Sequence, residues 1–169
     1  SNRQSHRRCT RYGRQRNMIR GFAAIALDRC KDTANLGGVL RAAQCYGAAS
    51  VAVSGGRMGK YATDTTKAYR HIPCTEVTDV WSAIPFGATP VVVELCDRAR
   101  SLVDFTHPES AFYIFGPEDG SVSKEIVAKA PLVVQVPTAF CMNLAATVNV
   151  LLYDRLAKRA RAEAMKGSA

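Results

Sequence analysis

The stretch "NLGGVLRAA" (residues 35–43) carries an arginine whose position suits nucleic-acid chemistry. Arg41 follows Gly37 by four residues, so both lie on one face of a predicted helix, and that face is bare enough for a nucleotide to reach the guanidinium. A guanidinium binds phosphate through two parallel hydrogen bonds. Because its pKa lies above about 12, we expect it to orient the reacting group and stabilise negative charge rather than act as a simple base. A surface ion pair of Arg41 with Asp28 or Asp32 is the alternative.

Two asparagines precede segments with helical periodicity. Asn35 and Asn143 stand where an asparagine side chain caps a helix N-terminus. The N-terminus of the helix after Asn143 favours negative charge, and could meet a carboxylate or an RNA phosphate. Capping is the plain structural role of both asparagines, and it is compatible with a second role in binding a nucleic acid.

Apolar strands and helices alternate along residues 21–165. The patterning predicts strands over 21–28, 50–55, 75–77, 89–96, 110–116 and 132–137. It predicts helices over 35–46, 60–71, 79–84, 121–130 and 144–164. Near-continuous apolar strands in this order indicate an α/β fold, with a mainly parallel sheet flanked by helices. The last helix has an apolar stripe that belongs either to the core or to a dimer interface: Leu144, Val148, Leu151, Leu152 and Leu156.

Ligands of open parallel sheets bind beyond the carboxyl ends of the strands. Three predicted strands end in turns rich in glycine, proline or small residues, namely "ELCDRARS", "GPEDGSVS" and "PTAFCMNLAATVN". Small residues let a ligand approach backbone groups closely. The sequence lacks three motifs of other protein classes: G-x-G-x-x-G after the first strand, which binds dinucleotides, the P-loop, and the G-x-S-x-G of serine hydrolases. A dinucleotide-binding oxidoreductase is therefore a poor alternative.

The net charge of +9 is concentrated at the N-terminus, because residues 1–20 hold seven arginines and no acid. We expect this arm to be disordered when free and to bind a polyanion such as the phosphate backbone of a nucleic acid. The arginines expected to contact that backbone, which the resemblance described below implies is RNA, are Arg7, Arg8, Arg11, Arg14 and Arg16, together with Arg41.

The six cysteines form no C-x-x-C pair and do not group with the three histidines. This spacing favours reduced thiols in a cytoplasmic protein over a metal site or a disulfide scaffold. No apolar run is long enough to span a membrane. We expect neither a metal nor a membrane partner.

Three segments together resemble, in order and spacing, the motifs of the SPOUT class of RNA methyltransferases, TrmH/SpoU family. They are "NLGGVLRAA" (35–43), "FGPEDGSVS" (115–123) and "VPTAFCMNLAATVNVLLYD" (136–154), and the resemblance covers nearly all of residues 21–157. It implies a C-terminal trefoil knot that binds S-adenosylmethionine, and a homodimer. The M-N-L form of the third segment is similar to the TrmL subgroup, which methylates a ribose of the tRNA wobble nucleotide.

Asn35 and Arg41 match the first motif and Asn143 matches the third, so the resemblance makes these three the candidate catalytic residues. It also implies which residues hold the cofactor: Glu94, Leu95, Gly116, Glu118, Val136, Cys141, Met142 and Leu144. Glu118 either braces its loop or reaches Arg41 of the partner subunit, unless it is only a solvated acid of the turn. Many relatives carry serine at the positions of Cys141 and Ala145, and a glycine at that of Ser121. A thiol donates a weaker hydrogen bond than a hydroxyl.

The resemblance implies an S-adenosylmethionine-dependent RNA 2′-O-ribose methyltransferase, with tRNA favoured over ribosomal RNA. Two alternatives stay open at this point. One is a SPOUT-like RNA-binding dimer that has lost catalysis, which the three departures favour. The other is a base methyltransferase of the guanine N1 type.

Overall fold

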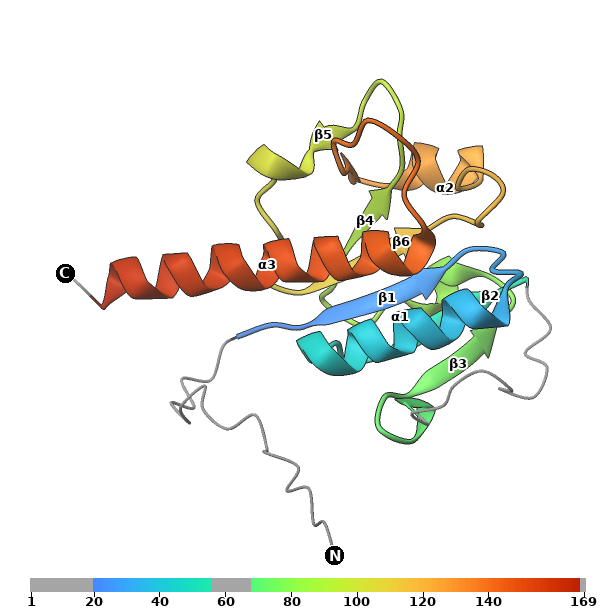
Figure 1. The fold of residues 1–169 in the computed structure, drawn as a ribbon, viewed down its shortest axis with the longest axis horizontal. Coiled ribbons are helices and arrows are strands. Elements are labelled where there is room, and N and C mark those ends of the chain that lie inside the picture. The colour runs from blue at the N-terminus through green and yellow to red at the C-terminus, as the bar shows by residue number, and fades with distance from the viewer. Residues whose placement is uncertain (1–19, 56–67, 168–169) are drawn as a thin grey trace, which may run out of the picture.

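The computed structural model describes residues 20–55 and 68–167, and within them a single parallel sheet (Figure 1). The order of its seven strands is β3-β2-β1-β6-β4-β7-β5. Their bounds are β1 Ala23–Leu27, β2 Val51–Ser54, β3 Cys74–Val77, β4 Thr89–Val93, β5 Arg100–Ser101, β6 Ala111–Phe115 and β7 Leu132–Gln135. Each neighbouring pair is parallel, so the predicted α/β fold with a mainly parallel sheet is confirmed.

Helices cover both faces of the sheet. The α-helices are α1 (Thr33–Tyr46), α2 (Lys124–Lys129) and α3 (Leu144–Lys166), and short 3₁₀ turns are η1 (Ala68–Arg70), η2 (Val80–Ala83) and η3 (Leu102–Asp104). Figure 1 shows α1 and α3 side by side on one face. The core on the other face includes buried residues of α2 and η2.

The strand β1 shows why the apolar pattern is continuous. Ile25 and Leu27 face the core beneath α1 and α3, whereas Ala24 and Ala26 face the core beneath α2 and η2. All five residues of β1 are buried. A strand covered on both faces has no solvent side on which polar residues could alternate.

The close approach of α1 to α3 depends on Gly38. A Cβ atom on Gly38 would lie 2.7 Å from the Cβ of Ala145, a distance that real Cβ atoms do not tolerate. Gly38 and Ala145 are therefore small because two helices meet there.

The N-terminus of α1 differs from the prediction. Asp32, not Asn35, is the N-cap residue: it has extended backbone geometry, and its Oδ1 accepts a 2.8 Å hydrogen bond from Ala34 N. Asn35 lies within the first helical turn, so its predicted capping role is wrong. The predicted cap of α3 is confirmed, because Asn143 Oδ1 accepts from the backbone N–H groups of Ala145 and Ala146.

The stripe on α3 is largely core, with one exception. Leu144, Val148, Leu151 and Leu152 are buried, whereas Leu156 is 49% exposed. The buried position beside it is Arg155, whose guanidinium donates to the backbone carbonyls of Phe22, Pro108 and Glu109. Of the two alternatives for the stripe, the core holds for the four buried residues, whereas Leu156 lies outside the core.

Several smaller elements also differ from the predictions. The strand β5 and the turn η3 have no counterpart among the predicted elements, and α2 begins at Lys124 rather than at 121. Of the helix predicted over 60–71, the structure describes the turn η1, and 60–67 lie outside the described residues. The basic arm, apart from Arg20, also lies outside them. The trefoil knot stays a prediction. No helix in the part of the chain that the structure describes is both long and apolar enough to cross a membrane.

Candidate active site

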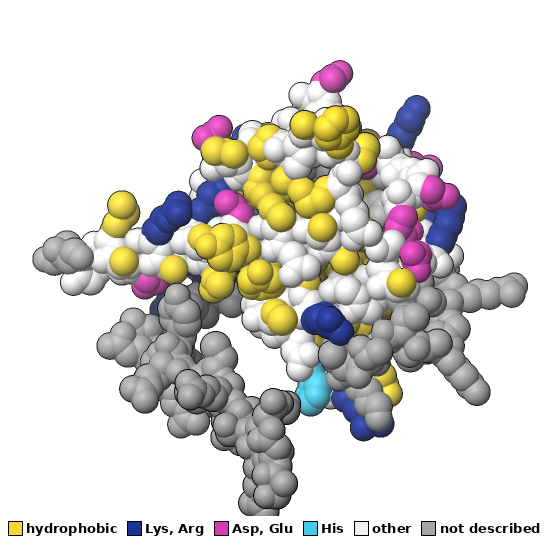
Figure 2. Space-filling model, viewed as in Figure 1, with side chains coloured by type: hydrophobic (Ala, Val, Ile, Leu, Met, Phe, Trp, Pro, Cys, Tyr) yellow, Lys and Arg dark blue, Asp and Glu magenta, His cyan; other side chains and the backbone are white. Residues whose placement is uncertain are grey.

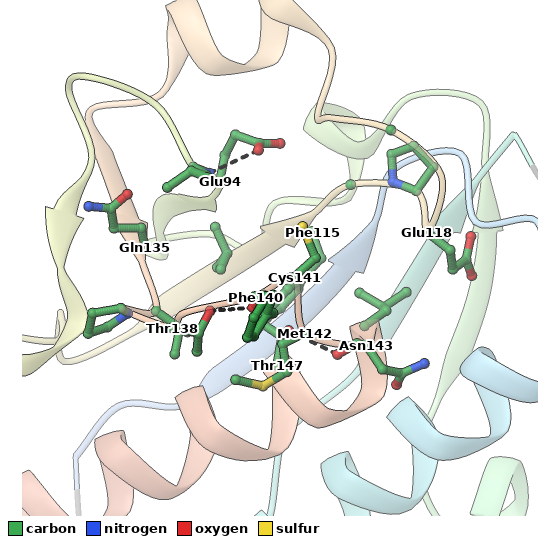
Figure 3. Close-up of a pocket in the computed structure, with 18 of the residues that line it drawn as sticks. Glu94, Phe115, Glu118, Gln135, Thr138, Phe140, Cys141, Met142, Asn143 and Thr147 are labelled. Carbon is green, nitrogen blue, oxygen red and sulfur yellow. Dashed lines mark hydrogen bonds between the residues drawn. The ribbon is translucent and has the colours of Figure 1, made fainter.

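A pocket of about 730 Å³ opens at the carboxyl ends of three neighbouring strands, β6, β4 and β7 (Figure 3). Phe115, Val93 and Gln135, the last residues of these strands, line it together with the loops that follow. The three turns singled out in the sequence thus meet at one place, because the sheet order makes their strands adjacent. A cavity of this size suits a cofactor or another small molecule.

The eight residues predicted to bind a cofactor all line this pocket: Glu94, Leu95, Gly116, Glu118, Val136, Cys141, Met142 and Leu144. Gly116 also satisfies a local constraint, because a Cβ atom there would lie 2.7 Å from the backbone nitrogen of Val122. The loop after β6 can therefore fold back against itself only with glycine at this position.

The carboxylate of Glu94 ties two walls of the pocket together. Its Oε1 accepts a 2.9 Å hydrogen bond from Leu95 N, and its Oε2 accepts a 2.7 Å bond from Val122 N. The loop after β4 is thereby fixed to the loop after β6. Hydrogen bonds between a carboxylate and backbone N–H groups are among the stronger ones in proteins.

Glu118 joins the loop after β6 to the start of α1. Its Oε1 accepts from the Cys30 thiol and Asn35 Nδ2, each at 3.3 Å, and from Asp32 N at 3.4 Å; its Oε2 accepts from Lys31 N at 3.3 Å. Of the two roles considered for Glu118, these contacts support the loop brace.

The contacts of Glu118 fix the protonation of the carboxyl and the neighbouring thiol. Desolvation alone would raise the pKa of Glu118, but the hydrogen bonds from its own backbone, Cys30, Lys31 and Asn35 lower it below its ordinary value. Burial, with the Glu118 carboxylate nearby, raises the pKa of Cys30 to about 12. At neutral pH the thiol therefore stays protonated and donates to an ionised carboxylate.

Asn35 and Asn143 meet directly. Asn143 Nδ2 donates a 2.8 Å hydrogen bond to Asn35 Oδ1, while Asn143 Oδ1 caps α3. Asn143 lines the pocket, and Glu118 holds Asn35 from the other side. Two of the three candidate catalytic residues therefore form one hydrogen-bonded unit at the mouth of the pocket.

Arg41 lies on α1 and is exposed, outside the residues that line the pocket. Asp28, one of the two carboxylates considered as its partner, is 5% exposed and accepts from Ser54 Oγ, Arg29 Nε and Ser123 N. This buried carboxylate joins β1, β2 and the start of α2. In the sequence, the only indication of this structural role of Asp28 is its position directly after a buried strand.

Pocket residues that sequence reasoning missed include Gln135, Thr138, Phe140 and Thr147. Thr138 Oγ1 donates to the Phe140 carbonyl at 2.8 Å, which fixes the turn before Cys141, and the Phe140 side chain is 88% exposed. The Oε1 atom of Gln135 is buried and has no hydrogen-bond partner among the described residues. Thr138, Phe140 and Thr147 stand within the third segment and Gln135 directly precedes it, but their types follow no recognisable pattern.

A second polar cluster lies along α3, about 15 Å from its N-terminus at a rise of about 1.5 Å per residue. His107 Nδ1 lies 2.7 Å from Tyr113 Oη, and His107 Nε2 lies 2.8 Å from Asp154 Oδ2. Burial raises the pKa of Tyr113 to about 12, so the phenol is protonated and donates to Nδ1. Burial lowers the pKa of His107 despite the Asp154 carboxylate, so the ring is neutral and donates from Nε2. Sequence reasoning did not find this cluster.

The fold is the one found in solved SpoU-type methyltransferases. The SpoU methyltransferase AviRb from Streptomyces viridochromogenes matches with a TM-score of 0.72 and 20% identity, over 85% of this chain and 62% of that one. It has also been solved in complex with the cofactor AdoMet. A structure from work on the 2-OH methylation of C/U34 on tRNA matches with a TM-score of 0.69 and 19% identity, over 82% of this chain and 91% of that one.

The chain belongs to the SpoU rRNA Methylase family, whose model matches residues 23–153. A curated relative, an uncharacterised tRNA/rRNA methyltransferase of Archaeoglobus fulgidus, is 28% identical over 144 residues, which are 79% of this chain and 63% of the relative. This chain thus spans less than two thirds of the length of that relative and of AviRb.

Proposed function

We propose that this protein is an S-adenosylmethionine-dependent RNA 2′-O-ribose methyltransferase that acts on tRNA in preference to ribosomal RNA. The observation that carries the proposal is the pocket at the ends of β4, β6 and β7, with the Asn35–Asn143 pair at its mouth. Membership of the SpoU rRNA Methylase family supports RNA methylation. The similarity to the structure from work on the 2-OH methylation of C/U34 on tRNA supports a ribose hydroxyl as the methylated group and tRNA as the substrate.

The pocket fits S-adenosylmethionine on two grounds. Gly116, which has no side chain, is part of the lining, so a ligand can approach the main chain there, and the buried Gln135 Oε1 lacks a donor among the described residues. The residues that would hold the cofactor are the eight predicted ones, which line the pocket. When bound, S-adenosylmethionine supplies a methyl group on a sulfonium, a good leaving group.

Methyl transfer to a ribose requires little covalent chemistry from the protein. The bound cofactor would supply the methyl group to the ribose oxygen, and the ribose hydroxyl would give up its proton. The task of the chain is to hold the ribose hydroxyl beside the bound cofactor and to limit the access of water to it. Asn35 and Asn143, held by each other and by Glu118, are placed to orient the ribose.

Arg41 is assigned the phosphate next to the target ribose. It stands on the same helix as Asn35 and is exposed, so an RNA strand approaching the pocket mouth can reach it. Its guanidinium binds phosphate bidentately and stays protonated at any physiological pH. It therefore positions the strand and stabilises negative charge on the ribose oxygen. The arginines of residues 1–20 add affinity that depends on salt rather than on sequence.

The active form is proposed to be a homodimer. On α3 the apolar side chains of Val150, Tyr153 and Leu156 are 38%, 60% and 49% exposed. Figure 2 shows hydrophobic side chains gathered over α3 and the loops beside it. Exposed apolar side chains that share one element mark an interaction surface, and a second copy of the chain is the partner proposed here.

The test is calorimetric titration of the purified protein with S-adenosylhomocysteine, the demethylated product. The proposal expects one site per chain with micromolar affinity. The alternative that Ser121, Cys141 and Ala145 favour, an RNA-binding protein without catalysis, expects no heat of binding and unchanged RNA affinity. Absence of binding by the intact protein contradicts the proposed function.

A further inference from the structure

Gln135 combines two properties that rarely occur together in a folded protein. It is the last residue of β7 and lines the pocket. Its Oε1 atom is buried, and no donor among residues 20–55 and 68–167 reaches it. An unpaired buried carbonyl oxygen is destabilising because it has lost its hydrogen bonds to water, so a site that retains one usually receives the missing donor from a ligand or water.

The neighbouring polar groups of the pocket have their partners within the chain. Both carboxylate oxygens of Glu94 accept from backbone N–H groups, and Asn143 uses its oxygen on α3 and its nitrogen on Asn35. Thr138 donates to the Phe140 carbonyl. Unlike these side chains, Gln135 Oε1 has no donor among the described residues and can accept from a ligand.

The position of Gln135 indicates which part of the ligand it meets. Figure 3 shows Gln135 at one end of the pocket, with Asn143 and Glu118 at the other. The reacting methyl group has to lie at the end of Asn35 and Asn143, where the ribose is held. The adenine, separated from the sulfonium by the cofactor's own ribose, then falls toward Gln135.

We infer that Gln135 Oε1 accepts a hydrogen bond from the exocyclic amine of the cofactor's adenine, and so makes the pocket select adenine over a base with a carbonyl at that position. The inference rests on the proposed function. The amine is a hydrogen-bond donor, whereas a carbonyl at the same position would place two acceptors against each other. Mismatches of this kind at buried polar groups carry the largest discrimination that binding sites achieve.

The experiment compares two ligands on two proteins by calorimetry. The ligands are S-adenosylhomocysteine and S-inosylhomocysteine, which differ only at the exocyclic group and the adjoining ring nitrogen. The intact protein should bind the adenosyl compound at least about tenfold more tightly than the inosyl compound. Gln135→Leu should lose about tenfold for the adenosyl compound and bind both alike. Thr147→Ala, a change at another lining residue, should keep the discrimination.

The outcomes separate this inference from the proposed function. If the intact protein binds both compounds equally, the inference is wrong while the proposed function stands, and this comparison needs no variant. Unchanged discrimination in Gln135→Leu also overturns it. If the intact protein binds neither compound, the proposed function fails and the inference fails with it. Thermal unfolding of each variant checks that the fold is kept.

Discussion

Asn143 Nδ2 donates a 2.8 Å hydrogen bond to Asn35 Oδ1, joining residues 108 positions apart in the sequence. The same Asn143 caps α3 through its other amide atom. One side chain thus fixes the start of a long helix and orients a second asparagine at the mouth of the pocket. The structural and chemical roles use different atoms, so substitution can separate them.

Asn143→Ala should lower the free energy of unfolding by about 1 kcal/mol, because the N-cap of α3 is lost. It should also lower methyl transfer at least about tenfold, since Asn35 loses its orienting donor. Asn143→Ser is the matched control: its hydroxyl restores the cap but does not replace the amide donor. Chemical denaturation and initial rates check both variants. Full activity in Asn143→Ser would show that the contact with Asn35 is dispensable.

Gly38→Ala should destabilise the protein by about 1–3 kcal/mol through overpacking, less what alanine gains in helix propensity. The new methyl group would meet Ala145, whose Cβ lies 2.7 Å from the position it must occupy. Adding Ala145→Gly should relieve the clash. A double-mutant cycle measured by urea denaturation should give a coupling energy of about 1 kcal/mol or more. Additive effects would mean that α1 and α3 are not in contact there.

Glu118→Gln should weaken S-adenosylhomocysteine binding about tenfold, because a neutral amide cannot accept from all the donors around it. The loop after β6 would then detach from the start of α1. The neighbouring Asp119 forms a solvent-exposed ion pair with Lys31 at 3.0 Å. Because exposed ion pairs contribute little, Asp119→Asn should change the affinity for S-adenosylhomocysteine less than about twofold. Calorimetry compares the two isosteric changes. Equal losses of affinity in the two variants would show that Glu118 does not brace the loop.

The stability of the fold should fall as the pH drops below about 6.5, the ordinary pKa of histidine. Burial lowers the pKa of His107 in the folded state below its value in the unfolded chain. At a pH between these two values, His107 is protonated in the unfolded chain and neutral in the folded one. This contribution is fully present above about pH 6.5 and is lost as the pH falls toward the folded pKa. Urea denaturation across this range checks it.

His107→Gln should flatten that pH dependence, and His71→Gln, at an exposed histidine, should leave it unchanged. A slope in His107→Gln equal to that of the intact protein would contradict the assignment of the neutral ring.

Much of the fold follows from local patterning, and the position of the pocket follows from the fold. Strands such as Ala23–Leu27 are apolar at every position because both faces are covered, so their existence and direction are predictable. The turn residues after β4, β6 and β7 mark the ligand side of a parallel sheet. The order of the strands is not encoded locally, since it depends on crossovers between distant segments.

The missed features all depend on partners brought together by folding. Asp32 and Asn35 are both good caps within one turn, and Asp32 takes the cap while Asn35 reaches Asn143, which the sequence places far away. Arg155 appears as a surface residue in a helical pattern, yet its guanidinium donates to two carbonyls of the loop before β6 and to one directly before β1. Gln135 gives no sequence signal, because only the pocket around it shows that a donor is missing.

Mass spectrometry of nucleosides tests the central claim most directly. Purified protein is incubated with a tRNA transcript and S-adenosylmethionine, and the RNA is then digested. The account predicts one 2′-O-methylated nucleoside, formed at least about 100-fold more slowly by Arg41→Ala and at the normal rate by Arg161→Ala, a matched loss of charge at an exposed arginine of α3. A methyl group on a base, no methylated product, or full activity in Arg41→Ala would contradict it.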